Sequence, residues 1–455
     1  MTESFDAIVI GTGPAGESAA GRLHSAGQRV AVVEAELIGG ECAYWACIPS
    51  KTLLRAPEVR TEAGRAQGVT TPDLDWADLR DYRDYMVRHL DDTAQVQGYA
   101  DQGVTVIKGH AAFTGPRTIT VADRQLSADN ILIATGSQPI IPPIDGLDDV
   151  PVWTNREATT LTDIPARALI IGGSAVGVEL ATFLTRFGTQ VSVVQSADRL
   201  LDREDPRVGE LVAAQLSEAG VTIHTSRTAR QARREGGDTV VTLDDGTQLR
   251  VDVIIIGAGR RPRTADLHLQ ATGITADERG AIPIDGSCRA GEGLWAVGDV
   301  TAVMPFTHVG MYQARVAVDT ILGHARTARY DGIPRVVFGD PEIAAVGITA
   351  AAARATGQNI LTAELDLADS IARPWTFEKQ PRGTLGLVAD ATEQRLLGAY
   401  AVAPLASEWI HQAALAIHVG IPLDVLRDQV AQFPTYSEAY LAAIETLHRP
   451  EKGTT

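Results

Sequence analysis

The segment GGECAYWACIPSK, residues 39–51, carries the residues best suited to chemistry. Cys42 and Cys47 stand close together at an expected helix start, beside glycine and followed by Pro49. A helix N-terminus lowers the pKa of a thiol and so favours the thiolate, which is the reactive form. Zinc sites usually need a second pair of ligands, and the remaining cysteine, Cys288, stands alone. The segment therefore favours a redox-active pair over a metal site or a pair of inert buried thiols.

Residues 8–23, IVIGTGPAGESAAGRL, have the pattern of a strand, a glycine-rich turn and a helix. Gly11 allows the tight turn, Gly13 lets the backbone approach a pyrophosphate, and Gly16 lets helix and strand pack closely. The helix N-terminus supplies amide donors and a positive dipole. Glu34 closes the following strand, where a carboxylate accepts hydrogen bonds from a ribose diol. This segment predicts a dinucleotide site.

A second copy of the pattern, LIIGGSAVGVELATFL, occupies residues 169–184. Gly172 and Gly177 fit it, but Ser174 stands where the second glycine is expected. Serine is small enough to leave room, although it takes a positive φ less cheaply than glycine. We expect a second nucleotide site here, with a strand–helix turn that binds no ligand as the alternative.

The end of the strand after this second motif bears on the choice between NADH and NADPH. An acid there would repel a 2′-phosphate and favour NAD, but this chain has Gln195. Arg199 and Arg203 lie just beyond and are within reach of such a phosphate. The pattern gives a slight preference for NADPH.

Length and composition limit the remaining possibilities. At 455 residues the chain is long enough for about three domains. Strand and helix patterns alternate twice around a Pro- and Gly-rich stretch at 138–151, which predicts two doubly wound α/β domains. The net charge of −17 argues against a nucleic-acid or anionic-membrane partner. The N-terminal MTESFDAIVIG has no basic n-region and no apolar h-region, so we expect no secretory signal and a cytoplasmic protein.

Six segments occur in the order and spacing of one family: GTGPAG, GGECAYWACIPSK, the ATG at 134–136, GGSAVGVE, GAGRRP and AVGDV. With them essentially the whole chain resembles the class I pyridine nucleotide–disulfide oxidoreductases, which include lipoamide dehydrogenase, glutathione reductase and mercuric reductase. The resemblance implies FAD on the first motif and NAD(P)H on the second, both in Rossmann-like domains. It implies an FAD-binding domain over 1–150, completed by about 283–330, and an NAD(P)-binding domain over 151–282. An α+β interface domain over 331–455 would form a homodimer.

The resemblance also implies roles for individual residues. Cys47 corresponds to the thiol beside the flavin that gives the charge-transfer band, and Cys42 to the interchange thiol that meets the substrate. Lys51 and Glu179 match an ion pair near the flavin N5 edge, and Asp299 matches the acid that binds the ribityl chain. The helix that begins near Thr307 and His308 would point its N-terminus at the flavin N1–C2 carbonyl. The implied cofactor-binding set comprises Gly11, Gly13, Pro14, Ala15, Gly16, Glu34, Gly40, Glu41, Cys42, Lys51, Ala134, Thr135, Gly136, Gly172, Ser174, Val176, Gly177, Gln195, Gly259, Arg260, Gly298, Asp299, Thr307 and His308, with no metal ligand.

One departure from the family pattern lies near the C-terminus. The family carries a His-Pro-Thr segment with a Glu five residues after the His, whereas this chain reads QFPTYSE at 432–438. Phe433 stands in the place of the histidine, and Glu438 is retained. The histidine is the proton shuttle between the thiols and the substrate, and such a base typically contributes about 10²–10⁴-fold. Ordinary dithiol–disulfide exchange should therefore be severely slowed.

Two interpretations of Phe433 follow. In one, another group substitutes for the base, such as Tyr436, His411, His418 or water held by Glu438. In the other, a proton donor at this place would be harmful. The family offers a precedent in 2-ketopropyl-coenzyme M oxidoreductase/carboxylase, which also has phenylalanine here.

The leading hypothesis is an FAD-dependent NAD(P)H oxidoreductase whose Cys42–Cys47 disulfide serves a non-standard small-molecule acceptor. The alternatives are dihydrolipoamide dehydrogenase, an NAD(P)H diaphorase or quinone reductase, and an FAD-binding subunit without activity. The tail HRPEKGTT has no cysteine, unlike the family members that use an extra C-terminal redox pair. Tyr44 and Trp45, between the cysteines, either pack against the flavin domain or shape an unusual pocket.

Overall fold

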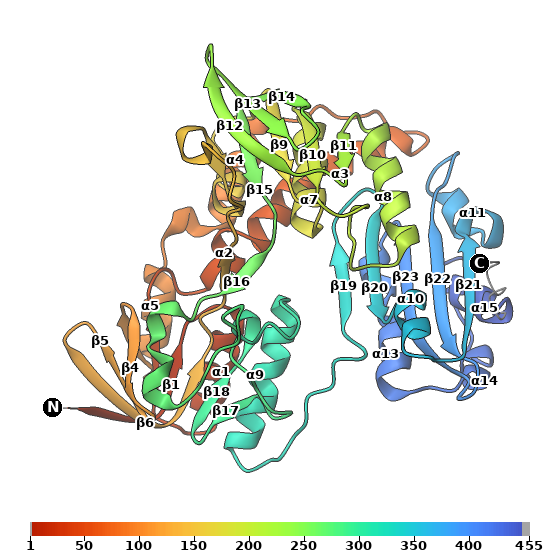
Figure 1. Ribbon diagram of the computed structural model, residues 1–455. Coiled ribbons are helices and arrows are strands. Elements are labelled where there is room, and N and C mark those ends of the chain that lie inside the picture. The colour runs from red at the N-terminus through yellow and green to blue at the C-terminus, as the bar shows by residue number, and fades with distance from the viewer. Residues whose placement is uncertain (1, 448–455) are drawn as a thin grey trace.

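The first glycine motif lies at the carboxyl edge of an eight-stranded sheet in the computed structural model, which describes residues 2–447 (Figure 1). The strand order is β17-β18-β6-β1-β2-β3, with β5 paired to β6 and β4 paired to β5. The strands are β1 (Glu3–Ile10), β2 (Val30–Glu34), β3 (Thr105–Lys108), β4 (Ala111–Gly115), β5 (Thr118–Val121), β6 (Arg124–Ile133), β17 (Arg289–Gly291) and β18 (Leu294–Ala296).

Strand β1 is central and parallel to both of its neighbours, β2 and β6. Its side chains alternate between the two faces, so Ile8 and Ile10 enter one core while Ala7 and Val9 enter the other. Helices α1 (Pro14–Ser25) and α9 (Thr307–Ile321) pack against each other in the second of these cores. Two helices that lie far apart in the sequence thus form one wall of the same cavity.

The segment that contains Cys42 and Cys47 folds into two helices that follow strand β2. They are α2 (Gly40–Tyr44) and α3 (Cys47–Arg65), and residues 45 and 46 separate them. The first domain also contains α4 (Trp76–Met86), η1 (Arg88–Leu90) and α5 (Thr93–Asp101).

The second glycine motif lies at the edge of a smaller five-stranded parallel sheet, in the order β11-β10-β9-β15-β8. A three-stranded antiparallel sheet, β12-β13-β14, covers one side of it (Figure 1). The elements are η2 (Leu147–Asp149), β8 (Val152–Trp153), α6 (Asn155–Thr159), β9 (Arg167–Ile171), α7 (Ala175–Arg186), β10 (Gln190–Gln195), α8 (Pro206–Glu218), β11 (Thr222–Thr225), β12 (Ala229–Glu235), β13 (Asp238–Leu243), β14 (Gln248–Val251) and β15 (Val253–Ile256).

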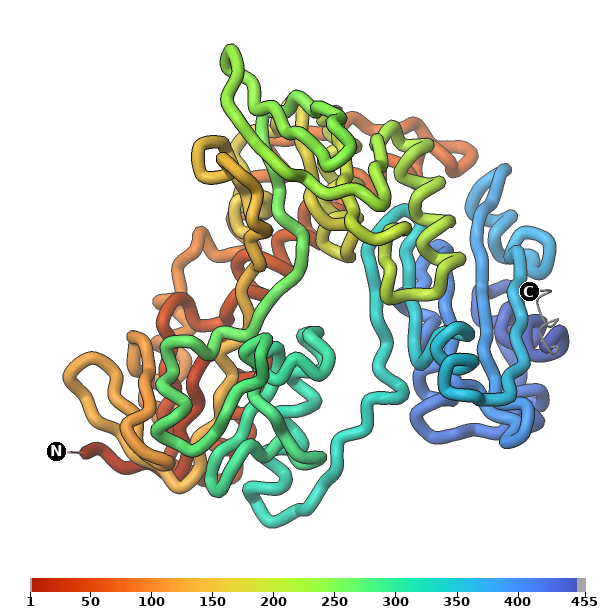
Figure 2. The backbone as a smooth tube through the Cα atoms, in the orientation of Figure 1, coloured from red at the N-terminus to blue at the C-terminus, as the bar shows by residue number. Residues whose placement is uncertain are grey.

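The chain crosses between these two domains twice, and the crossings pair with each other. Strands β7 (Ser137–Pro139) and β16 (Arg260–Pro262) form a two-stranded antiparallel ribbon between the domains. Figure 2 shows the green return segment running from the second domain to the first. After it, η3 (Ala265–Leu267) and η4 (Leu269–Thr272) contribute to the core of the first sheet. The chain therefore rejoins the first domain at about residue 263, earlier than the expected 283, because the apolar side chains of this stretch are buried there.

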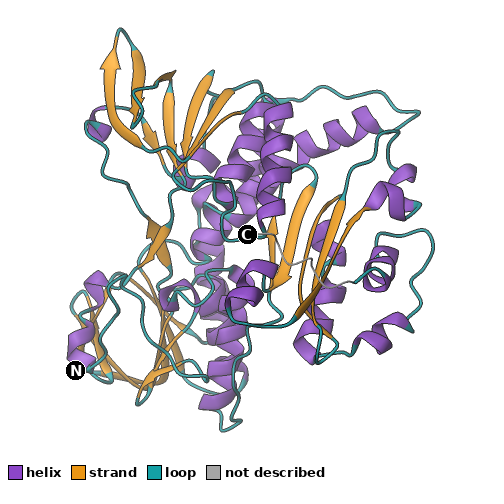
Figure 3. Cartoon of the chain, turned by 45° about the vertical axis from the view of Figure 1, so that its right-hand side comes forward, coloured by secondary structure: helices purple, strands orange, loops and turns teal. Residues whose placement is uncertain are grey.

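The third domain is built on a five-stranded antiparallel sheet, in the order β19-β20-β23-β22-β21, with helices packed on it (Figure 3). Its elements, with the preceding η5 (Gly298–Thr301), are β19 (Pro334–Val337), β20 (Glu342–Gly347), α10 (Ala350–Ala355), β21 (Ile360–Asp366), α11 (Leu367–Ser370), η6 (Arg373–Thr376), β22 (Thr384–Asp390), β23 (Arg395–Ala403), α12 (Ala406–Trp409), α13 (His411–Val419), α14 (Leu423–Arg427) and α15 (Glu438–Glu445). Two doubly wound domains followed by an α+β domain confirm the expected fold class. In residues 2–447 no helix is both long and apolar enough to cross a membrane.

Candidate functional site

Cys42 and Cys47 lie where three helices meet. Cys42 is on α2, Cys47 begins α3, and Thr307 begins α9. The Thr307 hydroxyl donates a hydrogen bond to Cys42 Sγ at 3.4 Å, and its Oγ1 also lies 3.3 Å from Cys47 Sγ. Both cysteines are half-buried free thiols. A single side chain from a distant part of the sequence therefore contacts both sulfurs.

The two thiols have opposite electrostatic environments. A hydrogen bond with the Cys42 thiol, assisted by Thr307 and the Lys51 ammonium, lowers the pKa of Cys47 to about 6 although burial opposes this. The same hydrogen bond, together with burial, raises the pKa of Cys42. At neutral pH the pair therefore shares one proton and one negative charge, with the thiolate on Cys47 and the thiol on Cys42.

Replacing Thr307 by valine should make the thiolate on Cys47 less stable. Thr307→Val keeps the β-branched shape but removes the hydroxyl, so we expect the pKa of Cys47 to rise by about one unit. Only the thiolate reacts with iodoacetamide, and it forms as the pH rises through the pKa. The midpoint of the alkylation rate of Cys47 against pH, followed by peptide mass spectrometry on reduced protein, should therefore move upward from near 6.

Thr52 offers a matched control, because its hydroxyl donates to the Ile48 carbonyl of the same helix, α3, and not to a thiol. Thr52→Val should leave the pH profile of Cys47 where it is. An unchanged profile in Thr307→Val would contradict the assigned role of the Thr307 hydroxyl.

Lys51 and Glu179 form an ion pair between the first two domains. Lys51 Nζ lies 2.6 Å from Glu179 Oε2, and the Glu179 side chain is only 9% exposed. The Phe338 N–H donates to Glu179 Oε1 at 3.1 Å, and the Phe338 ring lies 4.8 Å from Lys51 Nζ. Both oxygens of this buried carboxylate have a partner, Lys51 at one and the Phe338 N–H at the other, so the carboxylate holds the ammonium group in a fixed place. The pair thus connects α3, α7 and the residue after β19 at one point.

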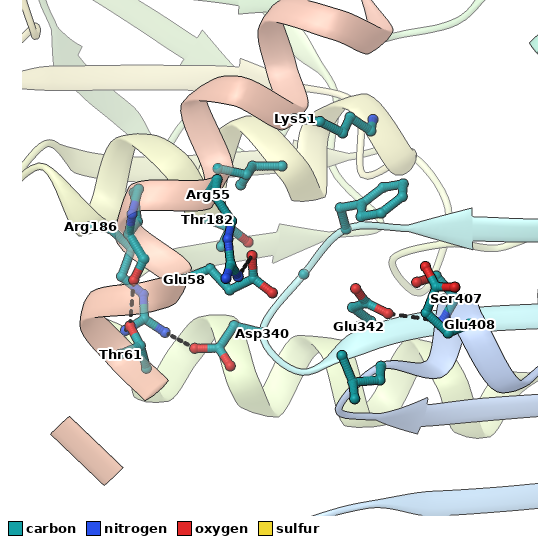
Figure 4. A pocket seen from close by; sticks show the side chains of 15 residues that line it. Lys51, Arg55, Glu58, Thr61, Thr182, Arg186, Asp340, Glu342, Ser407 and Glu408 are labelled. Atoms are coloured by element: carbon teal, nitrogen blue, oxygen red, sulfur yellow. Dashed lines mark hydrogen bonds and ion pairs between the residues drawn. The ribbon is translucent and has the colours of Figure 1, made fainter. Parts of the chain in front are cut away.

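A cavity of about 390 Å³ opens beside this ion pair (Figure 4). Lys51 and Arg55 project from α3 at one side of it. Arg186 of α7 donates hydrogen bonds to Thr61 and to Asp340, which precedes β20. This cavity therefore lies at the junction of all three domains, and paired charges fix its walls.

A larger cavity of about 1190 Å³ extends along the first glycine motif to Cys42 and Thr307. The residues of the expected cofactor set that line it are Gly11, Gly13, Pro14, Ala15, Glu34, Gly40, Glu41, Cys42, Ala134, Thr135, Gly136, Gly259, Arg260, Gly298, Asp299 and Thr307. Arg203 lines it as well. Lys51, His308 and the second glycine motif lie outside this lining, and Gly16 is buried in the helix–strand contact beneath it.

The backbone of the first motif fits a bound dinucleotide. Gly11 has φ +93°, and a Cβ on it would lie 2.4 Å from the Ala134 carbonyl oxygen. A Cβ on Gly16 would lie 1.9 Å from the Gly11 carbonyl oxygen, so neither position accepts a side chain. Helix α1 has no side-chain cap at its N-terminus, which leaves its first amides for a phosphate. Glu34 Oε2 is fixed by the Thr12 N–H at 2.8 Å and the Thr12 hydroxyl at 2.7 Å, at the place expected for a ribose.

The second motif repeats this geometry. Gly172 has φ +114°, and a Cβ on Gly177 would lie 2.0 Å from the Gly172 carbonyl oxygen. Ser174 has φ −76°, close to the −64° of Gly13. Serine therefore carries no backbone cost at this position, because the position does not require a positive φ. Its hydroxyl donates instead to the Gly257 carbonyl at 3.0 Å.

Gln195 takes the structural place that Glu34 has in the first motif. Its Oε1 accepts a hydrogen bond from the Gly173 N–H at 3.0 Å, which directs its amide NH₂ away from the motif backbone. Arg199 donates to Asp198 and to the Asp202 carbonyl, so its guanidinium is held by its own loop. Arg203 is exposed and lines the larger cavity, whereas Arg199 does not line it. Arg203 is therefore the better placed of the two arginines to contact a ligand.

The aromatic residues between the cysteines have different environments. Tyr44 is fully buried, and its hydroxyl donates to the Ile38 carbonyl at 3.1 Å. Trp45 is half-buried, and the Arg156 guanidinium lies 4.2 Å above its ring. Cys288 is buried away from this region, and burial raises its pKa to about 12, so it is an inert thiol at neutral pH.

His308 follows Thr307 but is held by other partners. Its Nε2 lies 2.9 Å from the Pro334 carbonyl oxygen, and its ring stacks on Phe306 at 5.4 Å. Partial burial lowers its pKa, as does the nearby His411, so the ring is neutral at pH 7. His308 thus connects the start of α9 to β19.

Glu438 begins α15 and Phe433 lies between α14 and α15, and Figure 1 shows α14 and α15 on the third domain, apart from α2. Phe433 is 76% exposed, and Glu438 Oε2 accepts a hydrogen bond from the Thr435 N–H at 2.8 Å. Of the suggested replacements for the base, Tyr436 is buried between Trp409 and Phe377. Burial raises its pKa to about 12, which makes it a poor base at neutral pH. His411 is exposed and His418 is half-buried.

Sequence reasoning missed the contact of Thr307 with the thiols and the partners of Glu41. The motif around Thr307 indicated a helix terminus but no sulfur contact. Asn155 and Arg156 belong to no motif, and a contact between them and residue 41 has no signal in the sequence. In the described residues no group of three or more His, Cys, Asp or Glu side chains is arranged to hold a metal ion.

Comparison with known proteins agrees with this geometry. Residues 5–320 match the pyridine nucleotide-disulphide oxidoreductase family, and residues 333–444 match its dimerisation domain. Dihydrolipoyl dehydrogenase of Thermus scotoductus is 34% identical over 98% of this chain and 98% of its own length. Mercuric reductase of Staphylococcus aureus is 30% identical over 98% of this chain and 83% of its own length.

Two solved structures have the same fold over nearly their whole length. The Cu(II) complex of the HOCl-induced flavoprotein disulfide reductase RclA from Escherichia coli has a TM-score of 0.88 and 30% identity, covering 98% of this chain and 99% of that one. LpdA from Mycobacterium tuberculosis has a TM-score of 0.87 and 27% identity, covering 96% of this chain and 99% of that one. With both domain matches and the paired thiols in place, the chain belongs to the class I pyridine nucleotide–disulfide oxidoreductases, flavin-dependent enzymes whose members use FAD and NAD(P)H.

Proposed function

We propose that this enzyme passes electrons from NAD(P)H, by way of FAD, to the Cys42–Cys47 pair and on to an acceptor that needs no histidine base. The second glycine motif would hold the nicotinamide nucleotide, and the larger cavity would hold FAD along Gly11, Glu34 and Asp299. Bound FAD would supply the two-electron exchange between a nicotinamide and a thiol pair.

The observation that carries the proposal is the contact of Thr307 Oγ1 with both sulfurs of the thiol pair, at 3.4 Å from Cys42 Sγ and 3.3 Å from Cys47 Sγ. In the reduced pair the thiolate on Cys47 is the better electron donor, and the thiol on Cys42 carries a proton that it must release when the disulfide closes. Thr307 and Cys42 line the larger cavity, and Thr307 also contacts the sulfur of Cys47. Lys51 lies one turn further along α3 and is paired with Glu179. These residues suit a thiol pair that is reduced from the cavity side.

Phe433 supports an acceptor outside the ordinary dithiols. Reduction of a disulfide by a thiol pair requires a proton for the leaving thiolate, and phenylalanine has none to give. Quinones exchange electrons directly with a flavin, and thiophilic metal ions bond to thiolates without a base. One relative is named a mercuric reductase and one solved neighbour is a Cu(II) complex, so both classes belong in an acceptor test.

An anaerobic NADPH titration of the purified enzyme tests the proposal. We expect a yellow protein with one FAD per chain, loss of flavin absorbance on titration, and two additional thiols per chain after reduction. The reduced enzyme is then mixed with lipoamide, a quinone or Cu(II), and the rate of reoxidation by each one is measured. The acceptor that reoxidises the enzyme fastest identifies the chemical class of the acceptor. A colourless protein that does not take up FAD, or a thiol count unchanged by NADPH, would overturn the proposal.

We also propose that NADPH is used at least as well as NADH. Gln195→Glu keeps the hydrogen bond with the Gly173 N–H but adds a charge that repels a 2′-phosphate. The rate of flavin reduction at low NADPH should fall at least about tenfold, while the rate with NADH should not fall. Gln190→Glu adds the same charge at the exposed start of the same strand, β10, and should change neither rate. A strong NADH preference of the unaltered enzyme in stopped-flow reduction would show this assignment to be wrong.

The third domain supports a homodimer. Its exposed apolar side chains are too numerous for a surface that faces only water. They include Leu415, Val419, Val425, Val430 and Phe433, with exposed fractions of 56–96%. A partner chain that covers this surface would also bring Phe433 and Glu438 to a thiol pair other than their own.

A further inference from the structure

Glu41, immediately before Cys42, faces an unusual concentration of positive charge. Its side chain is 16% exposed, and its Oε1 accepts a hydrogen bond from Arg260 Nη2 at 2.8 Å. Its Oε2 lies 3.4 Å from Arg263 Nη2 and 3.6 Å from Arg156 Nη2. One carboxylate therefore lies against guanidinium groups from three different residues that are distant from it in sequence, and two of these also pair with Glu36.

Asn155, the first residue of α6 in the second domain, holds both ends of the segment that carries Cys42. Its Nδ2 donates to Glu41 Oε1 at 2.9 Å and to the Trp45 carbonyl at 2.9 Å. The Thr159 hydroxyl donates to the same carbonyl at 3.1 Å. Asn155 is only 6% exposed, so these bonds are shielded from water. The Cys42 segment, residues 41–45, is thus anchored at both ends by the second domain.

The Cys42 segment is also tied to the ribbon that joins the two nucleotide domains. Arg260 begins β16, and besides Glu41 it donates from Nε to the Ser137 hydroxyl at 2.8 Å and from Nη2 to the Ser137 carbonyl at 2.9 Å. Its Nη1 donates to Asn155 Oδ1 at 3.2 Å. Ser137 begins β7, so both strands of the ribbon meet at the guanidinium that binds Glu41.

We propose that Glu41 is a positioning residue that, through Arg260 and Asn155, ties the Cys42 segment to the β7–β16 ribbon and the second domain. The network continues into the larger cavity, because the Ser137 hydroxyl also donates to Asp299 Oδ2 at 2.6 Å. Movement of the second domain, or a ligand at Asp299, is therefore transmitted to the Cys42 side of the thiol pair. Cys47 lies on α3 beyond this segment and is held by its own helix.

This role of Glu41 deepens the proposed function. Only the part played by the thiols in turnover rests on that function. The test uses chemically reduced, FAD-loaded protein, and it follows the alkylation of Cys42 and Cys47 separately by iodoacetamide and peptide mass spectrometry. Glu41→Gln removes the charge and turns amide donors toward guanidinium groups that cannot accept them. With the carboxylate gone and the guanidinium groups left, we expect the Cys42 profile to move to lower pH and its rate at pH 7.5 to rise roughly threefold or more. The Cys47 profile should move clearly less than the Cys42 profile, because the network of Glu41 contacts the Cys42 segment and not α3.

Glu36 provides a matched control, because it pairs with Arg156 and Arg263 of the same cluster rather than with Arg260 or Asn155. Glu36→Gln should leave both cysteines unchanged. Arg260→Gln combined with Glu41→Gln should bring the Cys42 midpoint back toward its original pH, since the charge is again balanced.

Equal acceleration of both cysteines in Glu41→Gln, or the same effect from Glu36→Gln, would overturn the proposal. A failure of the proposed function is distinguishable, because it would leave the thiol count of the unaltered enzyme unchanged by NADPH.

Discussion

Phe433→His should raise the rate of lipoamide reduction by about tenfold or more, because a positioned acid–base group supplies at least that much. Glu438 already lies five residues on, with Oε2 fixed by the Thr435 N–H, and its Oε1 would accept a hydrogen bond from the new imidazole. The variant is assayed on lipoamide, a small aromatic disulfide and a quinone. A gain on both disulfides, with no change on the quinone, is the expected result.

Val430 provides the control for this substitution, because it is an exposed apolar residue, 96% exposed, close by in the sequence. Val430→His adds the same side chain without an orienting carboxylate and should give no gain. If phenylalanine protects a proton-sensitive intermediate, Phe433→His would instead lower turnover with the true substrate while it raises thiol exchange. No change on any of the three acceptors would place Phe433 outside the working site.

Replacement of either cysteine by serine should lower disulfide reduction by at least about 10³-fold, because the two thiols act as one unit. The two variants should differ in their spectra. Cys47→Ser removes the thiolate and should abolish the long-wavelength charge-transfer band of the reduced enzyme. Cys42→Ser keeps a thiolate on Cys47 and should retain the band. In the unaltered enzyme the band should fade as the pH falls through about 6, since protonation of Cys47 removes the donor.

Cys288→Ser is the control for these variants, because this thiol is buried and its pKa is raised to about 12. It should retain both turnover and the band. Quinone reduction that survives in Cys42→Ser and Cys47→Ser would show that electrons reach that acceptor without passing the thiols. Loss of the band in Cys42→Ser but not in Cys47→Ser would reverse the assignment of the two thiols.

The fold and both nucleotide motifs could be predicted from the sequence because their determinants are local. Gly11 and Gly16 are required by contacts within one strand–turn–helix unit, and Glu34 ends the next strand of the same unit. The same spacing in the second motif predicts its geometry. The φ angle at Ser174 needed the structure, because the pattern of glycines does not reveal which of these positions has a positive φ.

The domain boundary after the second domain could be placed only by packing. The stretch from residue 263 to 282 contains apolar side chains that either nucleotide domain could bury, and periodicity alone does not choose between them. The structure buries Leu267, Leu269 and Ile282 against the first sheet.

The sequence by itself determined that two thiols lie close together at a helix start beside a dinucleotide motif, since residues a few positions apart must lie close in space. Only the tertiary structure decided what holds the pair in place. Thr307 reaches Cys42 from 265 positions away, and Arg260 reaches Glu41 from 219 positions away. Such contacts depend on how the separate sheets and helices pack together, and no spacing within one segment records them.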